Sequence, residues 1–320
     1  MLKNLFIIGL SLFVSLNANA SSIHSLIFRG DPVTSDQQYP YVVAIYHTRS
    51  GDGSDNLTAD CTGTIIADQW VLTAGHCVVA DEEDDPTTAK IASPAEIKVG
   101  TGPQAYSLSQ AKTVLSVEKI FTWNDRQQGY DNDHDLALLK LSQSSKISPV
   151  QLPETANDFS DLKSGNRSAT SLGYGWQDIQ FTNWPASCDI HPTENCGYVP
   201  LYDGSLHMGT ETIQPDQTIV NLIKQYETTL NPSASKYNAL TMLGVVSPTG
   251  KHGTPGDSGG PLLTLSSHQT QVLIGVTSWG PEKMTRAAID NGTYAKGPGI
   301  YISLLNTDHL TFIRNTMKNN

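Results

Sequence analysis

The sequence predicts an all-β protein, and three observations support that class. The chain of 320 residues is long enough to bury a large hydrophobic core. It contains many short runs of β-forming residues separated by Gly, Pro, Asn and Ser, which is typical of strands joined by turns. These runs lack the 3.6-residue periodicity of helices, except that Leu310, Ile313 and Arg314 fit one docked helical face. We therefore expect a C-terminal helix over 307–318.

The first twenty residues have the pattern of a secretory signal. Lys3 precedes an apolar stretch over 5–16, and Ala18 and Ala20 form a small-residue cleavage site. We expect residues 1–20 to be removed and the protein to be secreted, either outside the cell or into a periplasm. The apolar stretch is too short for a membrane span, and no other segment approaches one, so we expect no membrane anchor.

Two short apolar runs in the first half predict a hairpin. Residues 64–66 (TII) and 70–72 (WVL) flank a polar turn at Asp68. A longer apolar run follows over 136–141. The composition then turns polar, with Ser, Asn, Asp and Pro, over about 142–168, which indicates a linker.

The hexapeptide GDSGGP at 256–261 resembles the nucleophile loop of the trypsin and chymotrypsin family of serine proteases. A serine hydroxyl is a poor nucleophile, so it needs a base and donors that stabilise an oxyanion. Glycine at position 256 allows a sharp turn that aims the N–H groups of Gly256 and Ser258 at one point. The resemblance implies that Ser258 is the nucleophile.

In this family the catalytic residues follow the order His, Asp, Ser along the chain. The sequence upstream of Ser258 contains candidates for the histidine and for the aspartate. LTAGHC at 72–77 resembles the family's histidine segment, which implies that His76 is the general base. The competing interpretation is an ordinary surface or core histidine. Asp131, Asp133 and Asp135 compete for the acid. Only Asp135 immediately precedes the apolar run over 136–141, which resembles the strand after the catalytic aspartate, so we favour Asp135.

The resemblance implies a fold as well as a triad. It implies two six-stranded antiparallel β-barrels of the chymotrypsin type with the active site between them, covering 27–320. The first barrel is expected over about 27–141 and the second over about 169–320, after the linker at 142–168.

Further segments resemble the substrate-binding parts of the family. Ser278, Trp279 and Gly280 follow an apolar run over 272–276 and resemble the segment that pairs with substrate as an added strand. GPGIY at 297–301 resembles the next strand.

Specificity in trypsin-like members depends on an aspartate six residues before the nucleophile, and this position holds His252. Gly253, Gly280 and Gly299 match the walls of an open pocket. We predict cleavage after bulky neutral residues such as Tyr, Phe or Leu, with His252 offering one hydrogen bond. A preference for Glu or Asp at a protonated His252, and a permissive pocket from which His252 points away, are the alternatives.

The segment 27–30 (IFRG) resembles the start of the mature family chain, which makes 21–26 a short propeptide. A cut before Ile27 would free an amine that pairs with Asp257 and orders the oxyanion loop.

An even number of cysteines, four, predicts two disulfides in an exported chain. Cys61 and Cys77 match the bridge beside the catalytic histidine. Cys188 and Cys196 lie in an insertion over about 176–204, which either shapes substrate access or is a tolerated surface loop.

Two bridges of the family are missing. Thr254 stands where a cysteine normally closes the specificity pocket, and Ala169 and Thr264 replace another pair. We expect the second barrel to depend more on packing than its relatives do.

The formal net charge of −11 argues against a nucleic-acid partner. The acidic block 81–85 fits a solvated loop better than a cation site, because no alternating ligand pattern is present. The triad chemistry needs no cofactor or metal. The partners implied are protein or peptide substrates, an activating protease and protein inhibitors.

Two other functions compete with a protease. A catalytically silent binding protein on the same scaffold would normally lack a member of the triad. An α/β-hydrolase would show Gly-x-Ser-x-Gly and the order Ser, Asp, His, and neither is present.

Overall fold

The computed structural model describes residues 30–48, 57–80, 89–123, 131–155, 158–159, 161–183, 197–226, 236–251, 253–281 and 297–320. Several positions singled out in the sequence lie outside these ranges, namely Ile27, the block 81–85, Cys188, Cys196 and His252.

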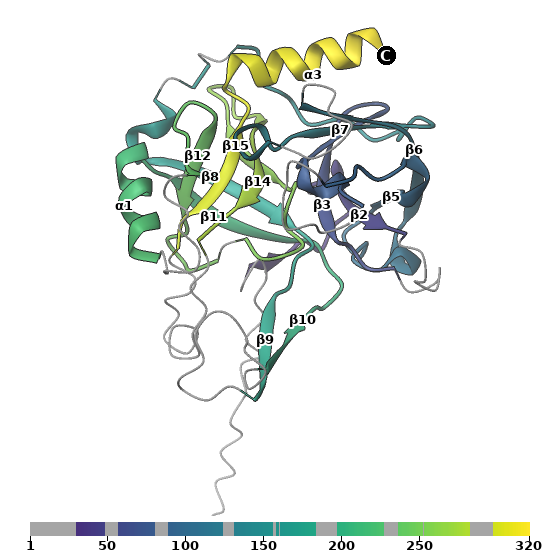
Figure 1. Cartoon of the computed structure of the whole chain (residues 1–320), viewed down its shortest axis with the longest axis horizontal. Coiled ribbons are helices and arrows are strands. Elements are labelled where there is room, and N and C mark those ends of the chain that lie inside the picture. Colours follow the sequence, from purple (N-terminus) through teal and green to yellow (C-terminus); the bar gives the residue numbers. More distant parts are fainter. Residues whose placement is uncertain are drawn as a thin grey trace, which may run out of the picture.

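The first half of the chain forms a closed barrel with the strand order β2-β3-β4-β7-β6-β5, in which all neighbours are antiparallel. It lies on the purple and blue side of Figure 1. Its strands are β2 (Val42–His47), β3 (Cys61–Ala67), β4 (Trp70–Thr73), β5 (Ile97–Thr101), β6 (Thr113–Thr122) and β7 (Ala137–Leu141). β3 and β4 are the hairpin predicted around Asp68.

The second half forms another closed barrel, in the order β11-β12-β15-β14-β13-β8, with β8 pairing back to β11. Its strands are β8 (Arg167–Gly173), β11 (His207–Ile213), β12 (Met242–Val246), β13 (Pro261–Leu265), β14 (Gln271–Trp279) and β15 (Gly299–Ser303). The prediction of two six-stranded antiparallel barrels is therefore confirmed. A two-residue strand, β1 (Asp31–Pro32), adds to the edge of β11.

Burial explains why these segments pair as they do. The β2 strand is buried along its whole length, and β11 alternates between buried and more exposed positions. A strand with alternating exposure covers the core on one face, whereas a fully buried strand also packs against loops or the other barrel. Thr264 Oγ1 on β13 donates to the Ser168 carbonyl at 2.9 Å, so a hydrogen bond joins the two strands where the family has a disulfide.

Two helices pack outside the barrels in the described part of the chain. The C-terminal helix α3 (Thr307–Asn319) matches the prediction over 307–318. It reaches from the second barrel to the first, where the Lys140 ammonium on β7 donates to the Asn320 carbonyl at 2.8 Å (Figure 1). The sequence analysis missed α1 (Asp216–Tyr226), which buries Ile219 and Ile223. Neither helix is long and apolar enough to cross a lipid bilayer.

The insertion predicted over 176–204 contains a hairpin in its described parts. Strand β9 (Asp178–Asn183) pairs antiparallel with β10 (Gly197–Leu201), and the pair extends away from both barrels in Figure 1.

Candidate active site

His76 and Asp135 come together at the junction of the two barrels. The His76 Nδ1–H donates to Asp135 Oδ2 at 2.8 Å, and the His76 backbone N–H donates to Asp135 Oδ1 at 2.8 Å. A carboxylate can only accept, so this pairing puts the ring proton on Nδ1 and leaves Nε2 as the lone-pair nitrogen.

The electrostatics of Asp135 favour its charged form. Its side chain is 1% exposed, and burial alone would raise the pKa. The charge of His76 and hydrogen bonds from His76 and Ser278 outweigh that effect, so the pKa of Asp135 lies below its ordinary value. A permanent negative charge next to the imidazole stabilises the imidazolium form.

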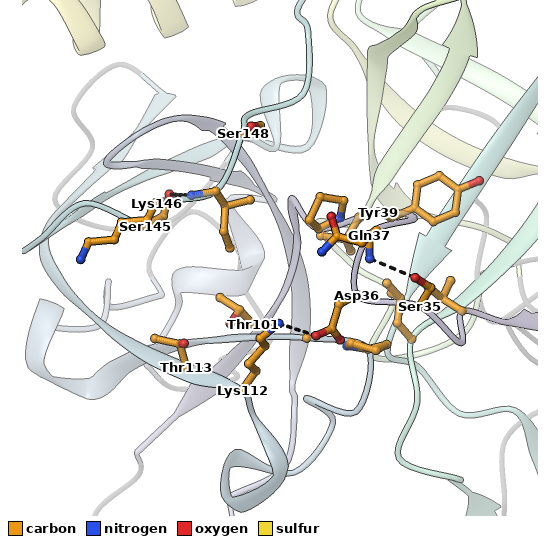
Figure 2. Close-up of a pocket in the computed structure, with 17 residues that line it drawn as sticks. Ser35, Asp36, Gln37, Tyr39, Thr101, Lys112, Thr113, Ser145, Lys146 and Ser148 are labelled. Atoms are coloured by element: carbon orange, nitrogen blue, oxygen red, sulfur yellow. Dashed lines mark hydrogen bonds and ion pairs between the residues drawn. The ribbon is translucent and has the colours of Figure 1, made fainter.

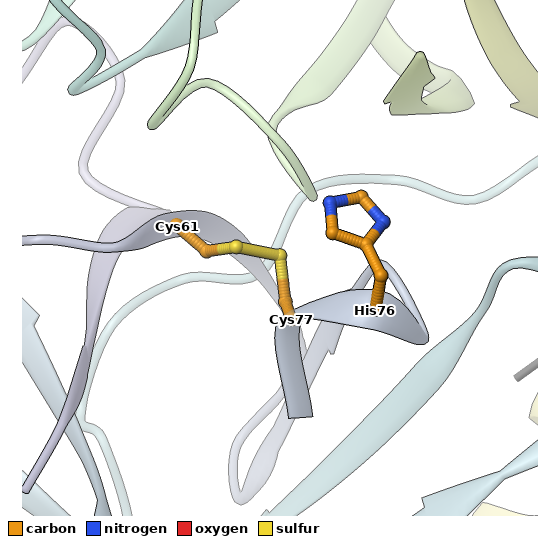
Figure 3. Close-up of side chains that lie close together, drawn as sticks. All are labelled: Cys61, His76 and Cys77. Atoms are coloured by element: carbon orange, nitrogen blue, oxygen red, sulfur yellow. A yellow bond between two sulfur atoms is a disulfide. The ribbon is translucent and has the colours of Figure 1, made fainter. Parts of the chain in front are cut away.

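Local structure places both residues. His76 begins a short 3₁₀ turn, His76–Val78, directly after β4. The disulfide between Cys61 on β3 and Cys77 ties this turn to the barrel (Figure 3). Among the described residues, Cys61, His76 and Cys77 are the one cluster of three potential metal ligands. Both sulfur atoms belong to the disulfide, so the cluster offers only an imidazole to a metal.

Of the three competing acids, Asp135 is the one bonded to His76. Asp131 Oδ1 accepts from the Asp133 N–H at 3.0 Å and so caps the turn Asn132–His134. Asp133 Oδ2 accepts from the side chain of Asn238 at 3.0 Å. The turn ends at Asp135, just before β7. Because β7 is buried from its first residue, the Asp135 carboxylate is also buried.

The loop that carries Ser258 packs against the histidine segment. The Thr62 N–H donates to the Ser258 carbonyl at 2.8 Å. Gly259 has φ +78°, and a Cβ there would lie 2.0 Å from Thr73 Oγ1 and 3.0 Å from the Ala74 nitrogen. Only glycine permits this approach, which brings the nucleophile loop within van der Waals range of residues just before His76.

The backbone around Ser258 turns sharply at a glycine. Gly256 has φ +99°, and its carbonyl accepts from Thr62 Oγ1 at 2.9 Å. Within the described residues, the N–H groups of Gly256 and Ser258 donate to no protein acceptor. Two unpaired donors on one short loop can bind an oxyanion.

The side chain of Asp257 is buried and accepts hydrogen bonds from two backbone N–H groups. Its carboxylate is 2% exposed and accepts from the Gly175 N–H at 2.8 Å and the Thr254 N–H at 2.7 Å. The Thr254 hydroxyl lies 3.0 Å from Asp257 Oδ2. Burial raises the pKa of Asp257 to about 6, and the three hydrogen bonds reduce the rise.

A pocket of about 350 Å³ opens beside Ser258. Its wall contains the predicted positions Gly253, Ser278, Trp279, Gly280 and Gly299. The structure thus brings together every predicted substrate-binding residue that it describes. His252, the predicted base of the pocket, lies outside the described residues.

Two features of this site were missed in the sequence. Ser278, predicted only to pair with substrate, donates from Oγ to Asp135 Oδ2 at 2.5 Å. Thr254, predicted only as a missing cysteine, bonds Asp257. The Ser278–Asp135 contact has no local sequence signal, because its residues are 143 positions apart, whereas the Thr254–Asp257 contact lies within one loop.

A second pocket, of about 360 Å³, is partly lined by residues 145–148 and shares no residue with the first. Figure 2 shows Asp36, Lys112 and Lys146 among its walls. Lys112 pairs with Asp36 there, so the charges on that side of the pocket are already matched.

Comparison with known proteins assigns the family. The family model for Trypsin matches residues 27–303, which is most of the chain. This chain belongs to the trypsin family. The phenoloxidase-activating enzyme of Bombyx mori is 26% identical to it over 304 residues, 91% of this chain and 60% of that relative. Kallikrein 1-related peptidase b8 of Mus musculus is 26% identical over 281 residues, 88% of this chain and 86% of that relative.

This trypsin-family chain therefore spans less than two thirds of the length of the silkworm relative. Both relatives are named as enzymes that activate or cleave proteins, and the barrels described above are the scaffold that the family uses.

Proposed function

We propose that this chain is a secreted serine endopeptidase that cleaves peptide bonds through an acyl-enzyme on Ser258. His76 Nε2 takes the proton from Ser258 as the hydroxyl attacks, and then gives it to the leaving amine. Asp135 holds the imidazole in the required tautomer. Water then attacks the acyl-enzyme. His76 takes the proton of the water and returns it to Ser258 as the acyl group leaves.

The observation that carries this proposal is the pairing of His76 with Asp135 beside the pocket that Ser258 lines. Ser278 joins the two parts, because it lines the pocket and also donates to Asp135. The unpaired N–H groups of Gly256 and Ser258 would stabilise the tetrahedral oxyanion. The peptidase and activating enzyme among the relatives support proteolysis.

The pocket favours large neutral side chains at the residue before the cut. Its walls at Gly253, Gly280 and Gly299 lack side chains, and no aspartate occupies position 252. An imidazole is a hydrogen-bonding group without a permanent negative charge, so it gives no strong attraction for Arg or Lys. Protein or peptide substrates with Tyr, Phe or Leu fit this pocket.

Export and processing complete the proposal. The signal at 1–20 would direct the chain out of the cytoplasm, and a cut after Leu26 by an activating protease would expose the Ile27 amine. That amine would add a cation beside the buried carboxylate of Asp257.

Covalent labelling tests the function directly. A fluorophosphonate probe should form an adduct on Ser258, located by mass spectrometry of the digested protein. Ser258→Ala should abolish the adduct and His76→Ala should slow it strongly, while Ser267→Ala on an exposed turn should change nothing. An adduct on another residue, or none on the processed wild type, would instead favour a catalytically silent binding protein.

A further inference from the structure

The carboxylate of Asp257 is buried, and the donors that contact it belong to the described part of the chain. Its three donors are the Gly175 N–H, the Thr254 N–H and the Thr254 hydroxyl. No cation contributes to the shift in the pKa of Asp257. The described structure therefore holds this carboxylate in place through hydrogen bonds alone.

Glycines pack closely around the acid. A Cβ at Gly173 would lie 2.0 Å from Asp257 Oδ1, and one at Gly175 would lie 2.4 Å from Thr254 Oγ1. A Cβ at Gly256 would meet the Gly175 Cα at 2.8 Å. Side chains at these three glycine positions would therefore clash with Asp257, Thr254 or the backbone beside them.

The Thr254 hydroxyl bridges two acceptors. It lies 2.8 Å from the Trp176 carbonyl oxygen and 3.0 Å from Asp257 Oδ2, and it has one proton. When Asp257 is ionised, the hydroxyl can donate to it. When Asp257 is protonated, the carboxyl can donate to the hydroxyl, which then donates to Trp176. The same contact survives in both charge states.

The same segment also sets the oxyanion loop. The Trp176 N–H donates to the Pro255 carbonyl at 3.3 Å, and the Asp257 N–H donates to the Thr254 carbonyl at 2.9 Å. These bonds fix the backbone on both sides of Gly256, whose N–H belongs to the proposed oxyanion hole. Asp257 and Thr254 therefore anchor the peptide that must point this N–H at the substrate.

Position 254 carries a hydroxyl in this chain. The family normally has a disulfide-bonded cysteine here, and a disulfide sulfur has no proton to donate. A threonine hydroxyl supplies a donor at the same place. We propose that Thr254 is a positioning residue that orders the oxyanion loop through Asp257 before the Ile27 amine is released, so that the uncut chain is already catalytically competent.

This inference rests on the proposed function and changes the role of the cut at Ile27. Cleavage would add a cation to a loop that Thr254 already orders, so it would increase activity without creating it. The closest test compares two forms of the protein. One begins at Ile27, and the other retains 21–26 and carries Leu26→Pro to block the cut, with its intact mass verified.

The measurements are the rate of Ser258 labelling by a fluorophosphonate and the kcat and KM on a neutral peptide. With Thr254 intact, the labelling rate of the uncut form should be within about tenfold of the labelling rate of the processed form. Thr254→Val should slow the uncut form about ten- to hundredfold, the range for one hydrogen bond to a charged group. The loss should be in kcat, because the oxyanion forms only in the transition state.

The processed form should tolerate Thr254→Val better, because the amine supplies a new partner for Asp257. Thr254→Ser keeps the hydroxyl, so both forms should retain their activity. Thr264→Val is the matched control, since it removes a buried hydroxyl of the same barrel that bonds Ser168. It should affect both forms equally. A role of Thr254 in stability alone would give this same equal loss, and that result would overturn the proposal.

Two further outcomes are decisive. Labelling of the processed wild type but not of the uncut wild type would overturn the inference and leave the proposed function intact. No labelling of either wild-type form would reject the proposed function, and the inference with it. The wild-type comparison needs no variant at Thr254, so the test stands even if Thr254→Val does not fold.

Discussion

The Ser278 hydroxyl donates to Asp135 Oδ2 at 2.5 Å, and His76 Nδ1 lies 2.8 Å from the same oxygen. One carboxylate oxygen thus accepts from the proposed base and from the segment that lines the substrate pocket. Because both donors stabilise the charged form, Ser278 supports the ionised state that the proposed mechanism requires. The segment of Ser278 that lines the pocket is thereby one hydrogen bond away from the carboxylate that contacts His76.

The first prediction concerns this link. Ser278→Ala should lower kcat/KM about tenfold, because it removes one hydrogen bond to a charged, buried group. Ser278→Thr keeps the hydroxyl and should retain most of the activity. The comparison uses steady-state kinetics on one neutral peptide. Equal kcat/KM for wild type and Ser278→Ala would show that the contact does not contribute to catalysis.

The second prediction identifies the acid. Asp135→Asn should reduce kcat by about four powers of ten, the loss known for this replacement in Ser-His-Asp triads, because the amide favours the wrong imidazole tautomer. Asp133→Asn is the matched control two residues away and should change kcat by less than about threefold. A large loss at Asp133 with little at Asp135 would contradict the assignment.

A buried glutamate in the second barrel predicts how stability depends on pH. Glu211 on β11 is fully buried, and its Oε1 accepts from Ser171 Oγ at 3.2 Å. Burial raises its pKa to about 8, although the Ser171 bond reduces the rise. The neighbouring Tyr301 stays neutral, because burial and the charge of Glu211 raise its pKa.

The sign follows from proton binding. From about pH 4.5 to 8, folded Glu211 keeps a proton that the unfolded chain releases, so stability falls as pH rises through this window. The total loss is at most about 5 kcal/mol. Glu211→Gln should match wild type near pH 5 and exceed it at pH 9 in urea unfolding. Glu154→Gln, on the surface, should follow wild type, and parallel curves for Glu211→Gln would refute the buried acid.

The last prediction concerns specificity. Matched peptides ending in Phe, Leu, Glu or Arg before the cut should give the highest kcat/KM for Phe or Leu. His252→Asp should move the preference toward Arg, because position 252 is the predicted base of the pocket and an aspartate there would add an anion. A wild-type preference for Glu that grows as the pH falls would support the protonated imidazole instead. A wild-type preference for Arg would contradict both interpretations.

Much of the fold was predictable from local patterns. The hairpin at β3 and β4 and the strand β7 have clear runs of apolar residues, the helix α3 has apolar residues at helical spacing, and all are present. Helix α1 was missed, because the prediction of an all-β chain depended on the strand-like runs. Packing of Ile219 and Ile223 against the second barrel stabilises it.

The sequence by itself determined the chemical groups of the site: the serine in its glycine loop, the histidine beside its cysteine, and the aspartate before a buried strand. The tertiary structure alone decided their hydrogen-bond partners. Ser278 and Asp135 are 143 residues apart, and Gly175 and Asp257 are 82 apart. No local pattern encodes such contacts, because they arise only when the closed barrels pack and bury these polar groups together.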